Sequence, residues 1–401
     1  MNKETRKVSG FINRLSESAT LAMSRKSREL QEKGVNVINL SLGEPDFDTP
    51  DFIKDAAKEG IDQNFTHYMP VNGYPDFREA ICKKLERDNG LQYTPDQIVV
   101  STGAKQSIVN VILATVNSGD EVILPAPYWV SYIEMVKMAG AEPVVIPSTI
   151  DTDYKIDAST LESYINDKTR MIIFSSPCNP SGSVYSEEEL RDFAAVLEKH
   201  PQVLIVSDEI YEHINYTPNH FSIGTIEAVK DQVITVNGVS KGFAMTGWRI
   251  GYIGAPEWIA KACTKLQGQF TSGASGISQR AAKAAVEADP SVTHHMKDAF
   301  LKRRELFTDL LKEIDGFEVN KPEGAFYMFP DISALFGKSD GDKTIENSDD
   351  LAEYILTKGH VATVSGSAFG SPDCLRISYA AGEKDLSEAA KRIKEAISKL
   401  S

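Results

Sequence analysis

The chain has 401 residues, of which 41% are hydrophobic and 25% charged, as in a globular protein that buries a sizeable core. Its formal net charge of −14 argues against a nucleic-acid-binding surface, because phosphate binding needs clustered positive charge. The sequence shows neither a membrane-spanning apolar run nor a signal peptide. The four cysteines form no C-x-x-C motif, so we expect free thiols and a cytoplasmic protein.

The N-terminal part of the sequence predicts three helices and a loop. Residues 21–33, 51–63 and 75–90 have the apolar periodicity of amphipathic helices. Residues 35–50, between the first two, are rich in glycine and proline and predict a loop.

From residue 97 onward, short β-branched runs alternate with helical patterns. The helical patterns include 105–117 and 186–200. This alternation predicts an α/β fold, with a largely parallel sheet covered by helices on both faces. Ligands of such sheets bind at the carboxyl ends of the strands. The strand-like runs are 97–104, 121–127, 142–148, 170–177, 203–210, 232–238 and 249–256.

The pattern changes after residue 290. A long charged helix is predicted over 294–315 and a final helix over 387–400, with a surface loop at 337–350. We expect a large domain at 49–290. Residues 1–48 and 291–401 are expected to form a smaller, discontinuous α+β domain.

Lys241 is the first candidate for a catalytic residue. It follows a predicted buried strand and a turn of small residues, and Arg249 lies eight positions further along. A lysine at the end of a buried strand is partly desolvated, which lowers the pKa of its amine and makes it a better nucleophile.

Gly238, Ser240, Lys241, Arg249 and Gly251 together resemble the Schiff-base lysine signature of the class-I aminotransferases. The chain is similar to subgroup Iβ, which includes prokaryotic aspartate aminotransferases, over nearly its whole length. The similarity is carried by SLGEPDFDTP, NGVSKGFAMTGWRIGY and LRISYA, in this order. It implies a fold-type-I enzyme with a seven-stranded sheet and pyridoxal 5′-phosphate as cofactor. It also implies a homodimer with shared active sites and amino transfer between L-aspartate and 2-oxoglutarate.

The resemblance also implies roles around the cofactor ring. Asp208 is expected to pair with the pyridine nitrogen, which favours the charged form of the ring. Tyr211 and Asn179 are expected to bind the ring hydroxyl oxygen, although this chain has Cys178 where the family more often has asparagine. Trp129 is expected to stack on the ring.

A cradle for the cofactor phosphate is predicted where a strand meets a helix. Backbone amides at a helix N-terminus bind anions, and Gly103, Ala104 and Lys105 lie at such a position. Ser240 and Arg249 add side-chain donors. By resemblance, Tyr68 is expected to reach the phosphate in the partner subunit.

Substrate carboxylates need cationic partners. By resemblance, Arg376 and the amide of Gly43 are expected to bind the α-carboxylate, and Lys105 the distal carboxylate of aspartate. Trp129 and Asn179 are expected to contact the substrate as well. Prephenate, aromatic and alanine aminotransferases, kynurenine aminotransferases and β-lyases remain open alternatives, which residues near Thr20, Lys105 and Phe326 would decide.

A serine hydrolase is a more distant alternative. Residues 238–242 form a literal G-x-S-x-G after a strand, with Ser240 as the nucleophile and His294, His295 or His360 as a possible base. No HGGG-type oxyanion segment accompanies it. No G-x-G-x-x-G follows a strand, no H-E-x-x-H predicts a metal site, and residues 1–48 are too short for a DNA-binding domain.

Overall fold

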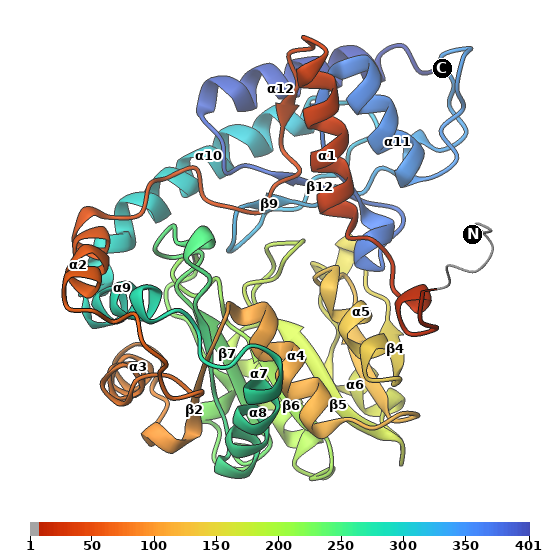
Figure 1. Ribbon diagram of the computed structural model, residues 1–401. Coiled ribbons are helices and arrows are strands. Elements are labelled where there is room, and N and C mark those ends of the chain that lie inside the picture. The colour runs from red at the N-terminus through yellow and green to blue at the C-terminus, as the bar shows by residue number, and fades with distance from the viewer. Residues whose placement is uncertain (1–7) are drawn as a thin grey trace, which may run out of the picture.

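A seven-stranded sheet forms the centre of the computed structural model, which describes residues 8–401 (Figure 1). The strands lie in the order β2-β8-β7-β6-β5-β3-β4, and only β8 is antiparallel to its neighbours. The predicted α/β fold with a mostly parallel sheet is therefore confirmed. The strands are β2 (Ile98–Ser101), β3 (Glu121–Pro125), β4 (Glu142–Ile146), β5 (Thr169–Ser175), β6 (Leu204–Asp208), β7 (Val233–Gly238) and β8 (Gly251–Gly254).

Both faces of this sheet are covered by helices. Neighbouring residues of a strand point to opposite faces. Ile173 of β5 therefore packs toward α4 (Ala104–Thr115), α5 (Ser131–Met138) and α8 (Glu257–Phe270). Ile172 and Phe174 pack toward α6 (Ala158–Tyr164) and α7 (Glu187–Leu197). All three side chains are at most 4% exposed. A strand buried on both faces can consist almost entirely of apolar residues, which explains the uninterrupted runs in the sequence.

The helices of this part of the chain begin and end at recognisable capping residues. Helix α7 begins with a capping box between Ser186 and Glu189, and α3 begins with Pro75 and ends at Gly90 in the left-handed conformation. The helices are α2 (Asp51–Asp62), α3 (Pro75–Asn89), α4 (Ala104–Thr115), α5 (Ser131–Met138), α6 (Ala158–Tyr164), α7 (Glu187–Leu197), α8 (Glu257–Phe270) and α9 (Gly276–Glu287).

A second group of elements lies beyond the carboxyl ends of the sheet, in the upper half of Figure 1. It joins the two ends of the chain, because β1 pairs with β10 in parallel, and β12 lies between β11 and β9 in an antiparallel sheet. Its elements are α1 (Ala19–Glu32), β1 (Ile38–Asn39), α10 (His294–Lys312), β9 (Tyr327–Met328), α11 (Ser348–Tyr354), β10 (Val361–Ala362), β11 (Val364–Ser365), β12 (Leu375–Ser378) and α12 (Glu383–Ile397).

Several boundaries in this second group differ from the sequence prediction by a few residues, and two of them have a clear local cause. The loop expected at 337–350 ends at Asn347, because the Asn347 side chain accepts a hydrogen bond from the amide of Asp350 and caps α11. The last helix begins at Glu383, where acidic residues in the first turn suit the positive end of the helix dipole.

The pairing of β1 with β10 agrees with the expected packing of the N-terminal segment against the C-terminal part. We propose the division into 49–290 and the discontinuous 1–48 plus 291–401 on this basis, although residues 1–7 lie outside the described residues. Among residues 8–401, every helix is too short or too polar to cross a bilayer. All four cysteines are free thiols, as expected.

Candidate active site

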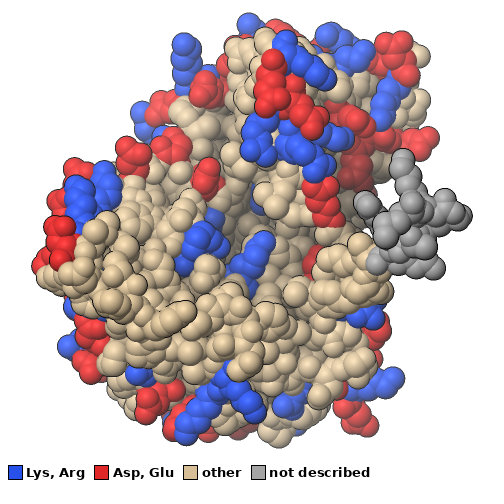
Figure 2. Space-filling view, viewed as in Figure 1, with Lys and Arg blue, Asp and Glu red and all other residues tan. Residues whose placement is uncertain are grey.

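A cavity of about 240 Å³ lies where the carboxyl ends of β5, β6 and β7 face the second group of elements. The surface is hollowed there, and lysine and arginine side chains gather in the hollow (Figure 2). The residues predicted to bind the cofactor or the substrate line this cavity, with the exception of Gly103 and Tyr68. Those lining it are Gly43, Ala104, Lys105, Trp129, Asn179, Asp208, Tyr211, Ser240, Lys241, Arg249 and Arg376.

Lys241 enters the cavity from the turn that follows β7. Its Nζ donates a hydrogen bond to the backbone oxygen of Gly43, at 2.5 Å. Burial lowers the pKa of the Lys241 amine to about 8; the carboxylate of Glu44 opposes this shift, and the charge of Arg376 adds to it. A lysine in this environment has a substantial neutral, nucleophilic fraction near neutral pH.

Asp208 is the last residue of β6 and is 4% exposed. Its Oδ2 accepts a hydrogen bond from the hydroxyl of Tyr132 at 2.6 Å, and its Oδ1 accepts one from the amide of Ile210 at 3.3 Å. Burial raises the pKa of the Asp208 carboxyl to about 6, against the effect of these two hydrogen bonds. The carboxyl group is therefore oriented, and its charged form would be stabilised by a cation placed in the cavity.

Arg376 lies on β12, on the opposite wall, and is 2% exposed. It donates to Oδ1 of Asn179 at 3.0 Å and to the backbone oxygen of Ser41 at 2.6 Å. Its Nε has no hydrogen-bond partner among residues 8–401, and its guanidinium lies 4.6 Å from the ring centroid of Tyr327. A buried guanidinium that is hydrogen-bonded only to neutral groups is suited to bind an anion.

Two of the tyrosines that line the cavity connect its walls. The hydroxyl groups of Tyr211 and Tyr327 are hydrogen-bonded at 2.8 Å, and burial raises the pKa of both phenols. A Cβ at Gly43 would lie 2.6 Å from the Tyr327 hydroxyl, so only glycine allows this approach. The loop at Gly43 therefore closes directly over the tyrosine pair.

The candidate anion cradle lies at the N-terminus of α4. Gly103 precedes the first helical residue with φ at +85°, and a Cβ there would collide with the guanidinium of Arg249. Arg249 itself has a left-handed backbone, with φ at +57°. A Cβ at Gly251 would collide with the amide nitrogen of Ala104. Glycine at these two positions therefore allows the N-terminus of α4, strand β8 and the Arg249 side chain to approach one another closely. This close approach fits an anion site better than a structural turn.

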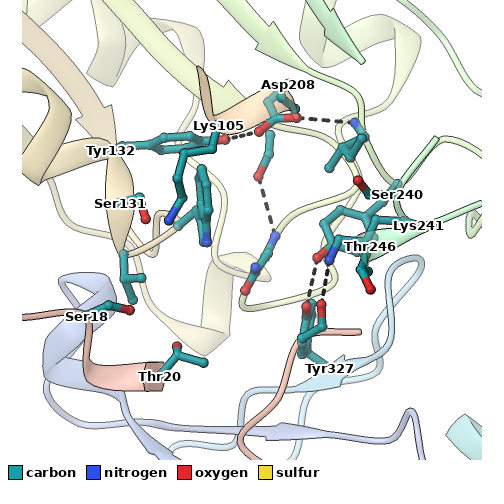
Figure 3. A pocket seen from close by; sticks show the side chains of 18 of the residues that line it. Ser18, Thr20, Lys105, Ser131, Tyr132, Asp208, Ser240, Lys241, Thr246 and Tyr327 are labelled. Carbon is teal, nitrogen blue, oxygen red and sulfur yellow. Dashed lines mark hydrogen bonds between the residues drawn. The ribbon is translucent and has the colours of Figure 1, made fainter. Parts of the chain in front are cut away.

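Lys105, in the first turn of α4, lies at the cavity rim. Its Nζ is 4.9 Å from the ring centroid of Trp129, and Trp129 packs edge-on against Tyr132 at 5.5 Å. Burial and the charge of Arg249 lower the pKa of the Lys105 amine. The labelled side chains of Lys105, Tyr132, Asp208 and Tyr327 surround a common space (Figure 3).

Some lining residues were not found from the sequence. Tyr132 lies three positions after Trp129 at the start of a helix, and this spacing could have indicated a shared face. Tyr327, Thr246 and Ser18 carry no local signal, because distant parts of the chain bring them to the cavity. Of the residues expected to decide between substrates, Thr20 and Lys105 line the cavity, whereas Phe326 is buried outside the lining.

Tyr68 is not in this cavity, because its side chain is fully exposed on the surface of the single chain. The hydrolase alternative finds no support. Ser240 does line the cavity, but within residues 8–401 no histidine lines it, so a base for the serine is missing.

Comparison with known proteins assigns a class to this arrangement of fold and site. The family model for aminotransferase class I and II matches residues 35–393. The chain therefore belongs to the class I and II aminotransferases, and it is an aminotransferase, as the sequence predicted.

Individual relatives are similar over almost the entire chain. A Petunia hybrida protein, a bifunctional aspartate aminotransferase and glutamate/aspartate-prephenate aminotransferase, is 47% identical over 97% of this chain and 82% of its own length. The crystal structure of the aspartate aminotransferase from Rhizobium meliloti has a TM-score of 0.95 at 40% identity, covering 99% of this chain and 100% of that one. The Thermus thermophilus aspartate aminotransferase with maleate has a TM-score of 0.92 at 36% identity, covering 98% and 100%.

Proposed function

We propose that the protein is a pyridoxal-phosphate-dependent aspartate aminotransferase that moves the amino group between L-aspartate and 2-oxoglutarate. One observation carries this proposal. The cavity contains two cations, Arg376 and Lys105, that are free to meet the two carboxylates of such substrates, together with the amine of Lys241. The names of the relatives support it, and so does maleate, because maleate is itself a small dicarboxylate.

The residues of the cavity fit the cofactor. Within residues 8–401, the buried carboxyl of Asp208 has no cationic hydrogen-bond partner, so it can hold a protonated pyridine nitrogen. The convergence of Gly103 and Arg249 at the start of α4, beside Ser240, can hold a phosphate. Tyr211 and Asn179 offer polar atoms to the ring hydroxyl, and Lys241 can hold the cofactor covalently.

Bound pyridoxal phosphate supplies an electron sink for the charge that develops at the substrate Cα. Arg376 orients the substrate by its α-carboxylate, and Lys105 by the distal one. We assign the proton transfer to Lys241: its neutral Nζ accepts the proton from Cα, a step that is typically worth about 10²–10⁴ in rate. Tyr132 and the Ile210 amide keep Asp208 oriented throughout the reaction.

Prephenate remains a second candidate substrate, because the name of the Petunia hybrida relative includes that activity. Prephenate also carries two carboxylates, so the same pair of cations can bind it. Steady-state kinetics with aspartate, glutamate, prephenate, tyrosine and alanine distinguish these preferences.

We propose a homodimer with shared active sites, located in the cytoplasm. The complete exposure of the Tyr68 aromatic ring supports the dimer, because a large exposed aromatic residue is typical of an interface.

Replacement of Lys105 tests the substrate assignment. Loss of a hydrogen bond between charged groups costs about 1.5–3 kcal/mol, so Lys105→Ala should lower kcat/KM for aspartate about 10- to 100-fold. For alanine, which has no distal carboxylate, the change should stay below about threefold. Equal losses for both amino acids would remove Lys105 from substrate recognition. Lys137→Ala, which breaks a salt bridge with Glu134 on α5, is the matched control and should change neither value.

A further inference from the structure

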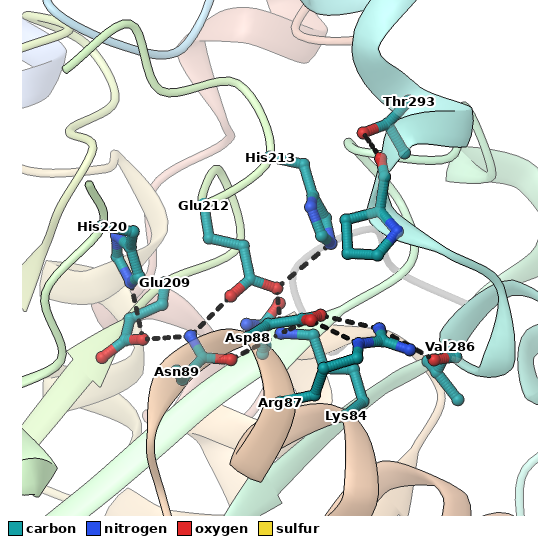
Figure 4. Close-up of polar contacts among 12 residues, drawn as sticks. Lys84, Arg87, Asp88, Asn89, Glu209, Glu212, His213, His220, Val286 and Thr293 are labelled. Carbon is teal, nitrogen blue, oxygen red and sulfur yellow. Dashed lines mark hydrogen bonds and ion pairs between the residues drawn. The ribbon is translucent and has the colours of Figure 1, made fainter. Parts of the chain in front are cut away.

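A buried polar network connects the end of β6 to α3, outside the cavity lining (Figure 4). Its centre is the ammonium group of Lys84 on α3, which is only 2% exposed. This ammonium forms an ion pair with Glu212, donates to Oδ1 of Asn89 at 2.7 Å and lies 3.8 Å from Asp88. Lysine is almost never buried to this extent without a charged partner.

The network holds two carboxylates at once. The amide nitrogen of Asn89 donates to Glu212 at 2.6 Å and to Glu209 at 3.3 Å, and so connects them. Glu209 also accepts from the hydroxyl of Ser222 at 2.5 Å and contacts Nε2 of His220 at 2.8 Å. These groups fix the orientation of both glutamates, which are at most 8% exposed.

The turn that carries these glutamates also carries two residues of the cavity. Asp208 and Tyr211 line the cavity, whereas Glu209 and Glu212, each one position later, bind α3. Residues 209–214 form neither helix nor strand, and backbone hydrogen bonds run from the amide of Glu209 to Val236, from Glu212 to Glu209 and from Ile214 to Tyr211. The side chains on the α3 side add to these bonds and tie the turn to a neighbouring helix.

Burial is the main cause of the raised pKa of Asp208, and the Glu209 carboxylate of the network adds to it. On the other side of the network, the Glu209 carboxylate raises the pKa of His220, while burial lowers the pKa of His213. Glu209, Glu212 and His220 could in principle hold a metal ion. Lys84 already donates to Glu212, Ser222 to Glu209 and Asn89 to both carboxylates, so we do not propose a metal there.

We propose that Lys84 is a positioning residue of the active site, which acts through Glu212 and Asn89 to hold Asp208 and Tyr211 toward the cofactor. The inference rests on the proposed function, since Asp208 and Tyr211 matter only if a cofactor ring binds between them. Removal of the ammonium group leaves the Glu212 carboxylate buried without its cation, and the turn has to move or take up a proton.

The test uses Lys84→Met, which keeps the length of the side chain, and Glu212→Gln, which keeps its shape and an acceptor oxygen. Both are compared with the wild type as apoprotein and holoenzyme. We expect the Kd for pyridoxal phosphate to rise about tenfold, as for other residues that orient ligand-binding side chains. The pH at which the visible absorption of the bound cofactor changes should shift by about 0.5 unit or more, because the turn carries Asp208 and Tyr211, and these residues influence the ionisation of the bound cofactor.

Glu162→Gln, which breaks an exposed ion pair with Lys199, is the matched control and should leave both values unchanged. A lower melting temperature with an unchanged spectral pH midpoint and Kd would reduce Lys84 to a purely structural residue and overturn the inference. If Lys84→Met does not fold, Glu212→Gln decides by the same two values. Failure of the wild type to bind the cofactor would instead reject the proposed function.

Discussion

At the scale of single residues, the site depends on placing ionisable groups where water cannot stabilise their charges. The pKa values of Lys241 and Asp208 shift in opposite directions for the same reason, because burial disfavours both the ammonium and the carboxylate. The amine becomes easier to deprotonate and the carboxyl more difficult to ionise. A cofactor with a cationic ring nitrogen would restore the charge of Asp208 and leave the nucleophilic amine available.

The lowered pKa of Lys241 predicts the pH dependence of cofactor capture. Only the neutral amine attacks an aldehyde, so the rate should increase as pH rises through about 8 and level off above it, rather than above about 10 as for an ordinary lysine. Stopped-flow absorbance of the apoprotein mixed with pyridoxal phosphate measures this rate. Lys241→Ala should give no borohydride-fixed cofactor at any pH. A rate that still rises steeply between pH 9 and 10 would contradict the assignment.

Tyr132 provides a second prediction at this scale. Tyr132→Phe removes the hydrogen bond to Oδ2 of Asp208, so the pKa of this carboxyl should rise further above its usual range. A hydrogen bond to a charged group contributes about 1.5–3 kcal/mol, so kcat should fall about 10- to 100-fold. Tyr354→Phe removes a buried hydroxyl that donates to Ala396. This control should lower the melting temperature and leave kcat unchanged, whereas equal effects on kcat would contradict the role of Tyr132.

At the scale of elements, the N-terminus of α4 lies in close contact with strand β8 and with the Arg249 side chain. Gly103→Ala would place a methyl group on the Arg249 guanidinium, in a backbone conformation that costs alanine about 1–3 kcal/mol. We expect the Kd for pyridoxal phosphate to rise at least about tenfold, because phosphate donors at the helix terminus are displaced. Fluorescence titration of the apoprotein measures this change.

The control for this substitution is Gly119→Ala. Gly119 has nearly the same φ, +88°, but a Cβ there meets no atom within 4 Å. It should reproduce the loss of stability without the loss of cofactor affinity. If both variants bind the cofactor equally well, the cradle lies elsewhere.

The sequence predicted these elements well because their signals are local. Each strand of the central sheet is a short apolar run; Asp208 ends one such strand, and Lys241 lies three residues after another. The start of α11 was missed because a charged stretch gave no sign that Ser348 would be fully buried. Tyr327 reaches the cavity through the pairing of β9 with β12, and such long-range register has no local signature.

The Lys84 network was missed for a similar reason. Lys84 looks like a solvated residue of an amphipathic helix, and its partner Glu212 is more than a hundred positions away. Roles such as that of Arg376 came from family resemblance rather than from physical inference, because nothing near it in sequence distinguishes it from a surface arginine.

At the scale of the whole molecule, the cavity is assembled from both groups of elements. Gly43 follows β1 and Arg376 lies on β12, whereas Asp208 and Lys241 come from the central sheet. The hydrogen bond from Lys241 to the oxygen of Gly43 connects the two groups directly. Any relative movement of the groups would therefore change the distance between the Lys241 amine and the Arg376 guanidinium.

The proposed dimer extends this assembly to two chains, and Tyr68 tests it. If Tyr68 completes the partner's site, Tyr68→Ala should weaken the cofactor affinity of the holoenzyme, although the residue contacts nothing in the cavity of its own chain. Lys241→Ala should inactivate only the site in its own chain. A heterodimer of the two variants would then have one site with both substitutions and one with neither.

Equal amounts of the two variants, denatured and refolded together, should therefore recover activity above the sum of the separate variants. Random pairing makes about half of the dimers mixed, each with one intact site, so the recovered activity should approach a quarter of the wild-type value. If each site were formed by one chain alone, the mixture would show no such gain. Every chain that keeps Lys241 carries the Tyr68→Ala substitution, so every such site would have that defect. Size-exclusion chromatography of the mixture verifies that pairing has occurred before the activities are compared.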